Sequence, residues 1–141
     1  MAIWFRPYTL EEVQQRGIGT MVEHIGITIT EIGENFLKGT MPVDHRTVQP
    51  MEILHGGASV ALAETLGSIA ATLAVDSDKK YCVGLDINAN HIRAVRKGLV
   101  TGIAKPLHIG SSTQVWSIEI TDEENKLVCI SRITMAVLVR K

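Results

Sequence analysis

LHGGASVALAETLGSIAATLAV, residues 54 to 75, is the stretch that decides the fold. No proline interrupts it, and from Ser59 to Val75 it consists mainly of Ala, Leu, Ile, Val and small polar residues. This length and composition favour helix over strand, so we predict one helix of about 25 Å. The helix is apolar nearly all round, and we therefore expect it to be buried, with the rest of the chain wrapped around it.

One ionisable residue lies inside this predicted helix. Glu64 is followed at i+4 and i+8 by Ser68 and Thr72, which places all three side chains on one helical face. A glutamate in apolar surroundings is rarely fully buried without a partner. Glu64 therefore reaches solvent, forms an ion pair or belongs to a functional site.

Two glycines stand directly ahead of the predicted helix. Gly56 and Gly57 would leave the first helical N–H groups open to a ligand oxygen, at the positive end of the helix dipole. This is the outline of an oxyanion site, although two glycines can also simply form a tight turn. Glu64 lies eight residues beyond Gly56, roughly 12 Å along the helix axis. A site that uses both groups would need a second subunit.

Length and charge exclude several classes of protein. The 141 residues predict a single domain, residues 1–141, large enough for one core. A formal net charge of -1 gives no electrostatic case for binding nucleic acid or an anionic membrane. Glu64 interrupts the longest apolar run, and the first residues lack the apolar segment of a signal peptide. We expect a cytoplasmic protein.

The two cysteines predict no redox or metal chemistry. Cys82 and Cys129 each lie in an apolar segment, which is typical of buried, reduced thiols. The chain contains no CxxC pair, Walker loop or dinucleotide-binding fingerprint.

The N-terminal third predicts two short helices and a hairpin. Thr9 and Glu12 have the spacing of a capping box, so a helix should begin there and end near Gly17. A second helical turn is expected over residues 20–24. Alternating isoleucines from Ile25 then predict a strand, and residues 36–43 return as its partner.

Four further strands are expected after the long helix. Val83, Leu85 and Ile87 should share one face of the first. The second, with Leu99, Thr101 and Ile103 alternating, should end at a turn over residues 106–110. The last two carry Trp116, Ile118 and Ile120, and Ile133, Met135 and Val137.

The resulting order is a hairpin, a long buried helix and a four-strand meander. This is an α+β layout with a mostly antiparallel sheet that must curve around the helix. One sheet face would remain to pair with another copy, so an oligomer is expected.

Six motifs resemble the hotdog-fold acyl-CoA thioesterases, in order and spacing and over essentially the full chain. They are similar above all to the bacterial branch that hydrolyses 1,4-dihydroxy-2-naphthoyl-CoA for menaquinone synthesis or proofreads aryl-loaded carrier proteins in siderophore synthesis. The motifs are Met41-Pro42-Val43-Asp44, Gln49-Pro50, Leu54-His55-Gly56-Gly57-Ala58-Ser59, Ala63-Glu64-Thr65-Leu66-Gly67-Ser68, Asn88-Ala89-Asn90-His91-Ile92-Arg93 and Pro106-Leu107-His108-Ile109-Gly110.

The resemblance implies a hotdog fold, in which an antiparallel sheet of five to six strands wraps around one central helix. It implies homodimers that pair sheets edge to edge and combine into a homotetramer. Glu64 matches the family's catalytic carboxylate, placed across the dimer interface from the other groups. Gln49 and His55 match residues beside the thioester carbonyl, Gly56 matches the helix-tip amide donor, and Ser68 matches a hydroxyl one turn beyond the carboxylate.

The resemblance also implies a binding site for the substrate and its CoA or pantetheine arm. Arginine and a glycine-containing loop suit phosphate groups, although a polar strand end and an ordinary turn would show the same residues. Glu52 departs from the family pattern near the acyl entrance and leaves the acyl preference open. The expected contact residues are Gly84, His91, Ile92, Arg93, Ala94, His108, Ile109, Gly110, Ser111, Ser112 and Thr113.

The implied substrate is an acyl-CoA or acyl carrier protein thioester, with no cofactor. A zinc site from His55, His91 and His108 would require three distant segments to converge without supporting spacing, so no metal is expected. Ser59 and Ser68 lie within the predicted helix and do not fit a nucleophile elbow. Two alternatives stay open: a hotdog hydratase or dehydratase, and a non-catalytic module that binds acyl-CoA or a carrier protein.

Overall fold

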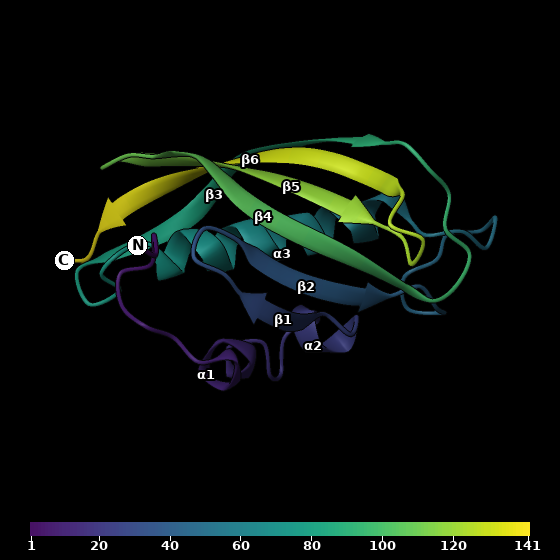
Figure 1. Ribbon diagram of the computed structural model, residues 1–141, viewed down its shortest axis with the longest axis horizontal. Coiled ribbons are helices and arrows are strands. Elements are labelled where there is room, and N and C mark those ends of the chain that lie inside the picture. The colour runs from purple at the N-terminus through teal and green to yellow at the C-terminus, as the bar shows by residue number, and fades with distance from the viewer.

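A computed structural model describes all 141 residues as a curved sheet wrapped around one long helix (Figure 1). This confirms the predicted α+β class and hotdog architecture. The helices are α1 (Leu10–Gln15), α2 (Met21–His24) and α3 (Gly56–Leu73). The strands are β1 (Thr28–Ile32), β2 (Leu37–Pro42), β3 (Lys80–His91), β4 (Leu99–Ile109), β5 (Thr113–Thr121) and β6 (Leu127–Val139).

The six strands form one antiparallel sheet in the order β1-β2-β4-β5-β6-β3. The predicted four-strand meander is therefore wrong, because β3 pairs with β6 and never with β4. Helix α3 carries the chain from β2 to the opposite edge of the sheet, where β3 begins. Of the four strands after α3, only β4, β5 and β6 are neighbours in chain order, and β3 is left as an edge strand.

The glycine pair lies inside α3, where the sequence predicted it to precede the helix. His55 is the N-cap, and its Nδ1 accepts a hydrogen bond of 2.7 Å from the Gly57 N–H. The helix ends at Leu73, two residues earlier than expected, with Ala74 as its C-cap. Because the His55 side chain caps the helix, α3 begins at Gly56, earlier in the chain than predicted.

Small residues let α3 lie close against the sheet. Gly39 of β2 and Gly102 of β4 face each other across the ladder, and Leu66 lies over both. A Cβ at either glycine would come within 3 Å of a Leu66 methyl group. Gly67 approaches Ile133 of β6 in the same way. Leu66 and Ile133 are fully buried at the centre of the core.

The helix is not enclosed on all sides, contrary to the prediction. One face packs into the sheet, whereas Glu64 is exposed and Val60, Ala61, Thr65 and Ser68 are only half-buried. The small and apolar residues on that second face therefore do not belong to the core of a single chain. None of the helices has both the length and the apolar character needed to cross a bilayer.

A β-bulge interrupts the expected alternation in β3. Gly84 pairs with Met135 and Asp86 with Thr134, so Leu85 has no partner. Cys82 faces the core before the bulge, whereas Ile87 and Ala89 do so after it. The extra residue shifts the side-chain parity. Val83 and Leu85 are therefore exposed, and the prediction that they share a face with Ile87 is wrong.

The inner face of β4 is also the opposite of the predicted one. Val100, Gly102 and Ala104 are buried, while Leu99 and Ile103 lie on the outer face. Small residues face inward here because α3 lies close to this part of the sheet. The strand also continues to Ile109, through the predicted turn, by means of a second bulge between Pro106 and His108.

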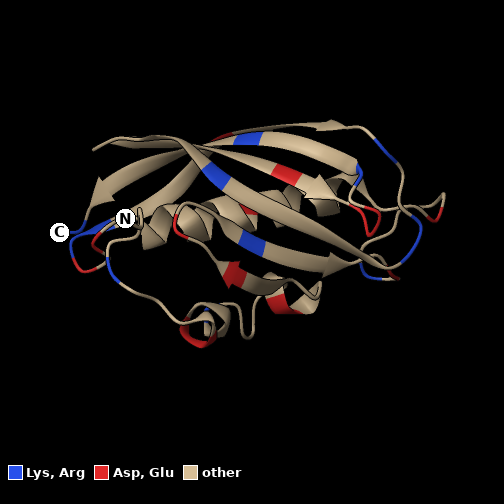
Figure 2. Cartoon of the chain, in the orientation of Figure 1, with Lys and Arg blue, Asp and Glu red and all other residues tan.

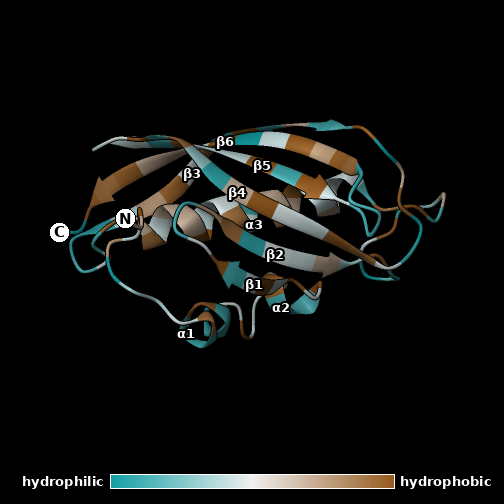
Figure 3. Ribbon diagram, viewed as in Figure 1, coloured by the Kyte–Doolittle hydropathy of each residue, from teal (hydrophilic) through white to brown (hydrophobic).

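The last two strands follow the predicted alternation. Trp116, Ile118 and Ile120 of β5 are fully buried, as are Ile133 and Met135 of β6. Figure 3 shows the corresponding alternation of apolar and polar bands along both strands. Buried Gln114 accepts a hydrogen bond of 2.8 Å from the Trp116 indole and donates one of 3.4 Å to the Ala71 carbonyl near the end of α3.

The N-terminal segment covers the open side of the core. The predicted capping box at Thr9 and Glu12 is present, and α1 stops at Gln15 as expected near Gly17. Trp4 stacks parallel to Trp116, with ring centroids 6.1 Å apart, and its indole donates to the Gly33 carbonyl.

Both cysteines are free thiols, as predicted. Cys129 is buried and Cys82 half-buried, and burial raises the pKa of each thiol. At neutral pH both are therefore protonated and poorly nucleophilic.

The contact between Leu66 and Gly102 is testable by a double-mutant cycle. We expect Leu66→Ala to destabilise the fold by ~2–5 kcal/mol through a cavity, and Gly102→Ala by ~1–3 kcal/mol through overpacking. The added methyl group would fill part of the Leu66→Ala cavity, so the double variant should be more stable than the sum predicts by about 1 kcal/mol. Urea unfolding measures all four proteins, and strict additivity would contradict the contact.

Candidate active site

A rigid turn leads from β2 into the candidate site. The Thr47 hydroxyl donates to the Pro42 carbonyl at 2.7 Å and accepts from the Asp44 N–H at 3.1 Å. Arg46 forms an ion pair with Asp44 at 2.7 Å. Hydrogen bonds from the Arg46 side chain and backbone hold the pKa of the Asp44 carboxyl at about 2. Together these contacts fix the start of the loop that carries Gln49.

Gln49 is oriented by the turn that follows it. Its side-chain oxygen accepts a hydrogen bond from the Met51 N–H, and its backbone carbonyl accepts one of 2.8 Å from the Glu52 N–H. Glu52 adopts a left-handed conformation with φ of 62° to close the turn. Because the amide oxygen is engaged, the Gln49 NH₂ group remains available as a donor.

The tip of α3 presents one free backbone donor. The Gly57 N–H is bonded to His55, and the N–H groups of Ala58 and Ser59 both donate to the His55 carbonyl. The Gly56 N–H has no acceptor within the chain. His55 thus acts as the helix cap through Nδ1, so its neutral ring carries the proton on Nε2.

His91, at the end of β3, packs directly on this tip. A Cβ at Gly56 would lie 2.9 Å from the His91 Nε2 atom, so only glycine leaves room for the imidazole. A cavity of about 330 Å³ opens beside the pair. Among the residues that line it are six of the predicted site residues: Gln49, Gly56, His91, Ile92, Arg93 and Ala94.

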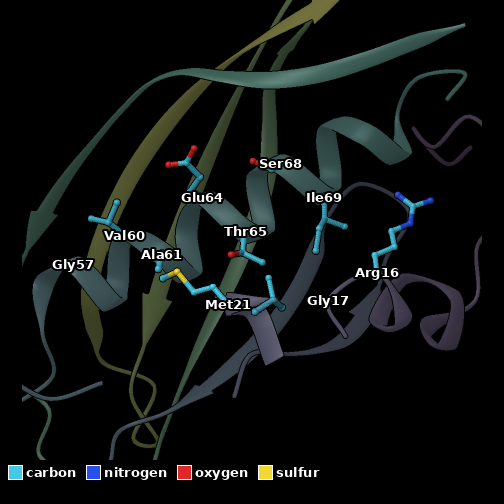
Figure 4. Close-up of a pocket in the computed structure, with 11 residues that line it drawn as sticks. Arg16, Gly17, Met21, Gly57, Val60, Ala61, Glu64, Thr65, Ser68 and Ile69 are labelled. Carbon is cyan, nitrogen blue, oxygen red and sulfur yellow. The ribbon is translucent and has the colours of Figure 1, made fainter. Parts of the chain in front are cut away.

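A second and larger cavity, of about 500 Å³, contains Glu64 (Figure 4). Its floor is the half-open face of α3, with Val60, Ala61, Glu64, Thr65 and Ser68, and its wall includes Met21 and Val22. The Glu64 carboxylate forms no hydrogen bond and no ion pair within the chain. It is therefore free to act on a ligand.

Ser68 points toward the same side of α3 as Glu64 (Figure 4). Its hydroxyl has only a weak partner in the chain, the thioether sulfur of Met135 at 4.0 Å. The Thr72 hydroxyl donates instead to the Ser68 carbonyl at 2.9 Å. The polar stripe predicted on α3 thus has two members available for chemistry, Glu64 and Ser68.

Within one chain the predicted catalytic residues are divided between the two cavities. Glu64 and Ser68 line the larger one, whereas Gln49 and Gly56 line the smaller one. His55 lies exposed at the helix tip and lines neither cavity. One chain therefore does not bring the acid and the free backbone donor to a common point.

The predicted residues for the CoA arm are also divided. His91 to Ala94 lie beside the helix tip, at the right of Figure 1, whereas the turn between β4 and β5 lies at the left end of the sheet. In that turn the Gly110 N–H donates to the Thr113 carbonyl at 2.8 Å, and the His108 ring packs over Gly110. His108 to Thr113 line neither of the two cavities.

Several lining residues were not foreseen from the sequence. Helical periodicity around Glu64 would have indicated Val60 and Ala61, which precede it by four and three residues. Met21 and Val22 come from α2, and Arg16 comes from the segment between α1 and α2. Nothing in their local pattern reveals a contact with α3, because that contact depends on tertiary packing.

The candidate site does not have the composition of a metal centre. No three His, Cys, Asp or Glu side chains gather closely enough to hold a metal ion. His55 and His91 are both engaged at the helix tip, while His108 lies at the other end of the sheet.

Comparison with known proteins gives the family. Residues 51–129 match the profile of the thioesterase superfamily. The chain is 53% identical over 136 residues to 1,4-dihydroxy-2-naphthoyl-CoA hydrolase of Escherichia coli. The aligned residues cover 96% of this chain and 99% of that relative. It is 51% identical to proofreading thioesterase EntH of Cronobacter sakazakii, over 96% of this chain and 98% of the relative.

A solved structure supports the same assignment. The crystal structure of a mutant thioesterase from Pseudomonas aeruginosa matches with a TM-score of 0.97 and 42% identity, covering 99% of this chain and 100% of that one. The match therefore extends over nearly the whole chain. This chain belongs to the thioesterase superfamily and is a thioester hydrolase.

Proposed function

We propose that the protein hydrolyses acyl-CoA thioesters with an aromatic acyl group, using a site shared by two subunits. Glu64 of one subunit faces Gln49, His55 and Gly56 of the other. The observation that carries this proposal is the separation within one chain of a free carboxylate from a free helix-tip N–H. The products are the free acid and CoA.

The exposed edge of the sheet supports pairing of two subunits. Strand β3 has twelve residues and β6 on one side only. It exposes apolar side chains at Tyr81, Val83 and Leu85. A long apolar edge strand is a ready surface for another strand. We propose that two copies pair along β3 and that two such dimers form a tetramer.

The carbonyl of the thioester would be polarised by the helix tip. The Gly56 N–H is a free donor at the positive end of the α3 dipole, and the Gln49 NH₂ group lines the same cavity. Donors aimed at the oxyanion that develops on the carbonyl oxygen stabilise the transition state more than the substrate.

Glu64 would drive the attack on the carbonyl carbon. It acts either as a general base on water or as a nucleophile that forms an anhydride with the acyl group. In the general-base route Glu64 takes a proton from the attacking water, the C–S bond breaks, and the CoA thiolate takes up a proton as the free acid is released. In the nucleophilic route the C–S bond breaks as the anhydride forms, the thiolate takes up a proton, and water then hydrolyses the anhydride to the free acid and the restored Glu64 carboxylate. We assign Ser68 to positioning the water and His55 to assisting the leaving group through its Nε2 proton.

The acyl group would occupy the cavity beside Glu64. Its walls at Met21, Val22, Val60, Ala61 and Ile69 are apolar, which suits a flat ring system. A naphthoyl group is named in the activity of the Escherichia coli relative. We extend this class to the present chain and infer a role in menaquinone biosynthesis.

The CoA arm would lie along the loop between β3 and β4. That loop carries Arg93, Arg96 and Lys97, and Arg93 lines the cavity at the helix tip. Figure 2 shows the basic segments along the loop. These side chains suit the phosphate groups of CoA or of a carrier-protein pantetheine. Gly84 and the turn at His108 to Thr113 complete the proposed substrate contacts, the turn contributed by the second subunit.

Glu64→Gln should lower kcat by about 100-fold or more, because the amide neither removes a proton from water nor attacks the carbonyl. KM for benzoyl-CoA should change little, since the shape of the cavity is kept. Thiol release followed with a chromogenic disulfide measures both constants. Undiminished turnover would show that Glu64 is not the catalytic acid, whereas no turnover in the unmodified protein would favour the binding-module alternative.

Mixing two inactive variants tests whether the site is shared. Glu64→Ala and Gln49→Ala proteins, unfolded together and refolded, should form mixed dimers with one intact site and one doubly damaged site. Activity should return to about a quarter of the unmodified level, since about half of the dimers are mixed. Each variant refolded alone is the control, and no recovery would show that the groups act within one chain.

A substrate panel separates hydrolysis from the rival β-carbon chemistry. We expect thiol release from naphthoyl-CoA and benzoyl-CoA with kcat/KM about tenfold or more above that for hexanoyl-CoA, because flat rings fill the apolar cavity better. Crotonyl-CoA should show no loss of enoyl absorbance without thiol release. Hydration of crotonyl-CoA would instead support a hydratase.

A further inference from the structure

Strand β3 passes directly over the Glu64 carboxylate at Gly84. A Cβ at Gly84 would lie 2.7 Å from the Glu64 Oε2 atom, closer than real Cβ contacts allow. The next nearest atoms, Glu64 Cδ at 3.8 Å and Ile133 Cδ1 at 3.9 Å, are at ordinary contact distance. Figure 4 shows the carboxylate directed from α3 toward the teal strand that crosses above it.

The backbone itself does not require glycine at this position. Gly84 is absent from the residues with positive φ, which are Gly19, Gly26, Gly98, Glu52 and Asn125. It is also exposed, so no packed side chain or backbone atom excludes a methyl group. The one group that a side chain here would displace is the Glu64 carboxylate.

The β-bulge beside Gly84 explains how Gly84 and the later residues of β3 that face α3 can differ in parity. Because Leu85 is unpaired, side-chain parity changes between Gly84 and Asp86. Gly84 and His91 both face α3 as a result, although they are an odd number of residues apart. The same strand therefore meets Glu64 at one point and the Gly56 tip at another.

The neighbouring strand adds a second constraint at the same level. Met135 of β6 pairs with Gly84, and its sulfur is the contact of the Ser68 hydroxyl at 4.0 Å. The paired residues Gly84 and Met135 thus touch the two available polar groups of α3, one each. Their arrangement defines where the Glu64 carboxylate can lie relative to Ser68.

We propose that Gly84 is a positioning residue for the Glu64 carboxylate, in addition to any contact it makes with substrate. This inference rests on the proposed catalytic role of Glu64. A side chain at position 84 pushes the carboxylate away from the sheet and out of line with the thioester carbonyl. Most substrate contacts, those of the acyl cavity and of the loop between β3 and β4, are kept.

A double-mutant cycle with a shorter acid tests the proposal. Gly84→Ala should lower kcat by about 10- to 100-fold through displacement of the carboxylate, with KM changed less than about threefold. Glu64→Asp withdraws the carboxylate by one methylene group, beyond reach of the new methyl group. In the Glu64→Asp background, Gly84→Ala should therefore lower the remaining kcat less than about twofold.

Thr28→Ala is the control, since Thr28 is an exposed residue of β1, at the opposite edge of the sheet from β3, and the proposed mechanism does not use it. It should keep full activity, and all variants should keep the circular dichroism spectrum and elution volume of the unmodified protein. An unchanged kcat in Gly84→Ala, or an equal loss in both backgrounds, would overturn the positioning role. Unchanged turnover in Glu64→Gln would instead overturn the proposed function and this inference with it.

Discussion

The rise of a single helix constrains everything else in this structure. Gly56 offers the free N–H at the start of α3, and Glu64 lies eight residues along the same helix, which separates them by roughly 12 Å of axial rise. A thioester carbonyl and the oxygen that attacks it are about 3 Å apart at reaction. Because the axial separation is several times larger than this distance, we propose that the two groups of one α3 act in different sites. In agreement with this separation, Glu64 and Gly56 line two different cavities of the chain.

The glycines that face α3 leave space for two different kinds of neighbouring group. At Gly39 and Gly102 the space is taken by Leu66, and at Gly67 by Ile133, so these glycines set the distance between helix and sheet. At Gly84 the space is taken by a carboxylate oxygen that has no other partner. A side chain at Gly39, Gly67 or Gly102 should reduce stability. A side chain at Gly84 should instead change the position of the Glu64 carboxylate. The identity of the neighbouring atom distinguishes the two.

Most of the fold was predictable because it follows local rules. The capping box at Thr9, the long helix and the strands around Trp116 and Ile133 all depend on neighbours in sequence. The order of the strands and the parity of β3 were not predictable, since a bulge at Leu85 leaves no mark in the alternation itself. The inner face of β4 was misassigned because Val100, Gly102 and Ala104 are small to admit the helix. In the candidate site, the separation of Glu64 from Gly56 followed from helix rise, but the contribution of Met21 and Val22 required the tertiary structure.

The position of β3 along α3 indicates how a second chain would bring together the proposed site residues that lie apart in one chain. The strand begins near the end of α3 and finishes beside its tip, where His91 packs on Gly56. Pairing of two such edges about a two-fold axis is antiparallel, so it sets the tip of one helix toward the far end of the other. The same operation would bring His91 to Ala94 of one copy toward the partner's turn between β4 and β5. The two divided sets of residues, the catalytic groups and those proposed for the CoA arm, would thus be reunited by one symmetry operation along an edge that already exposes Tyr81, Val83 and Leu85.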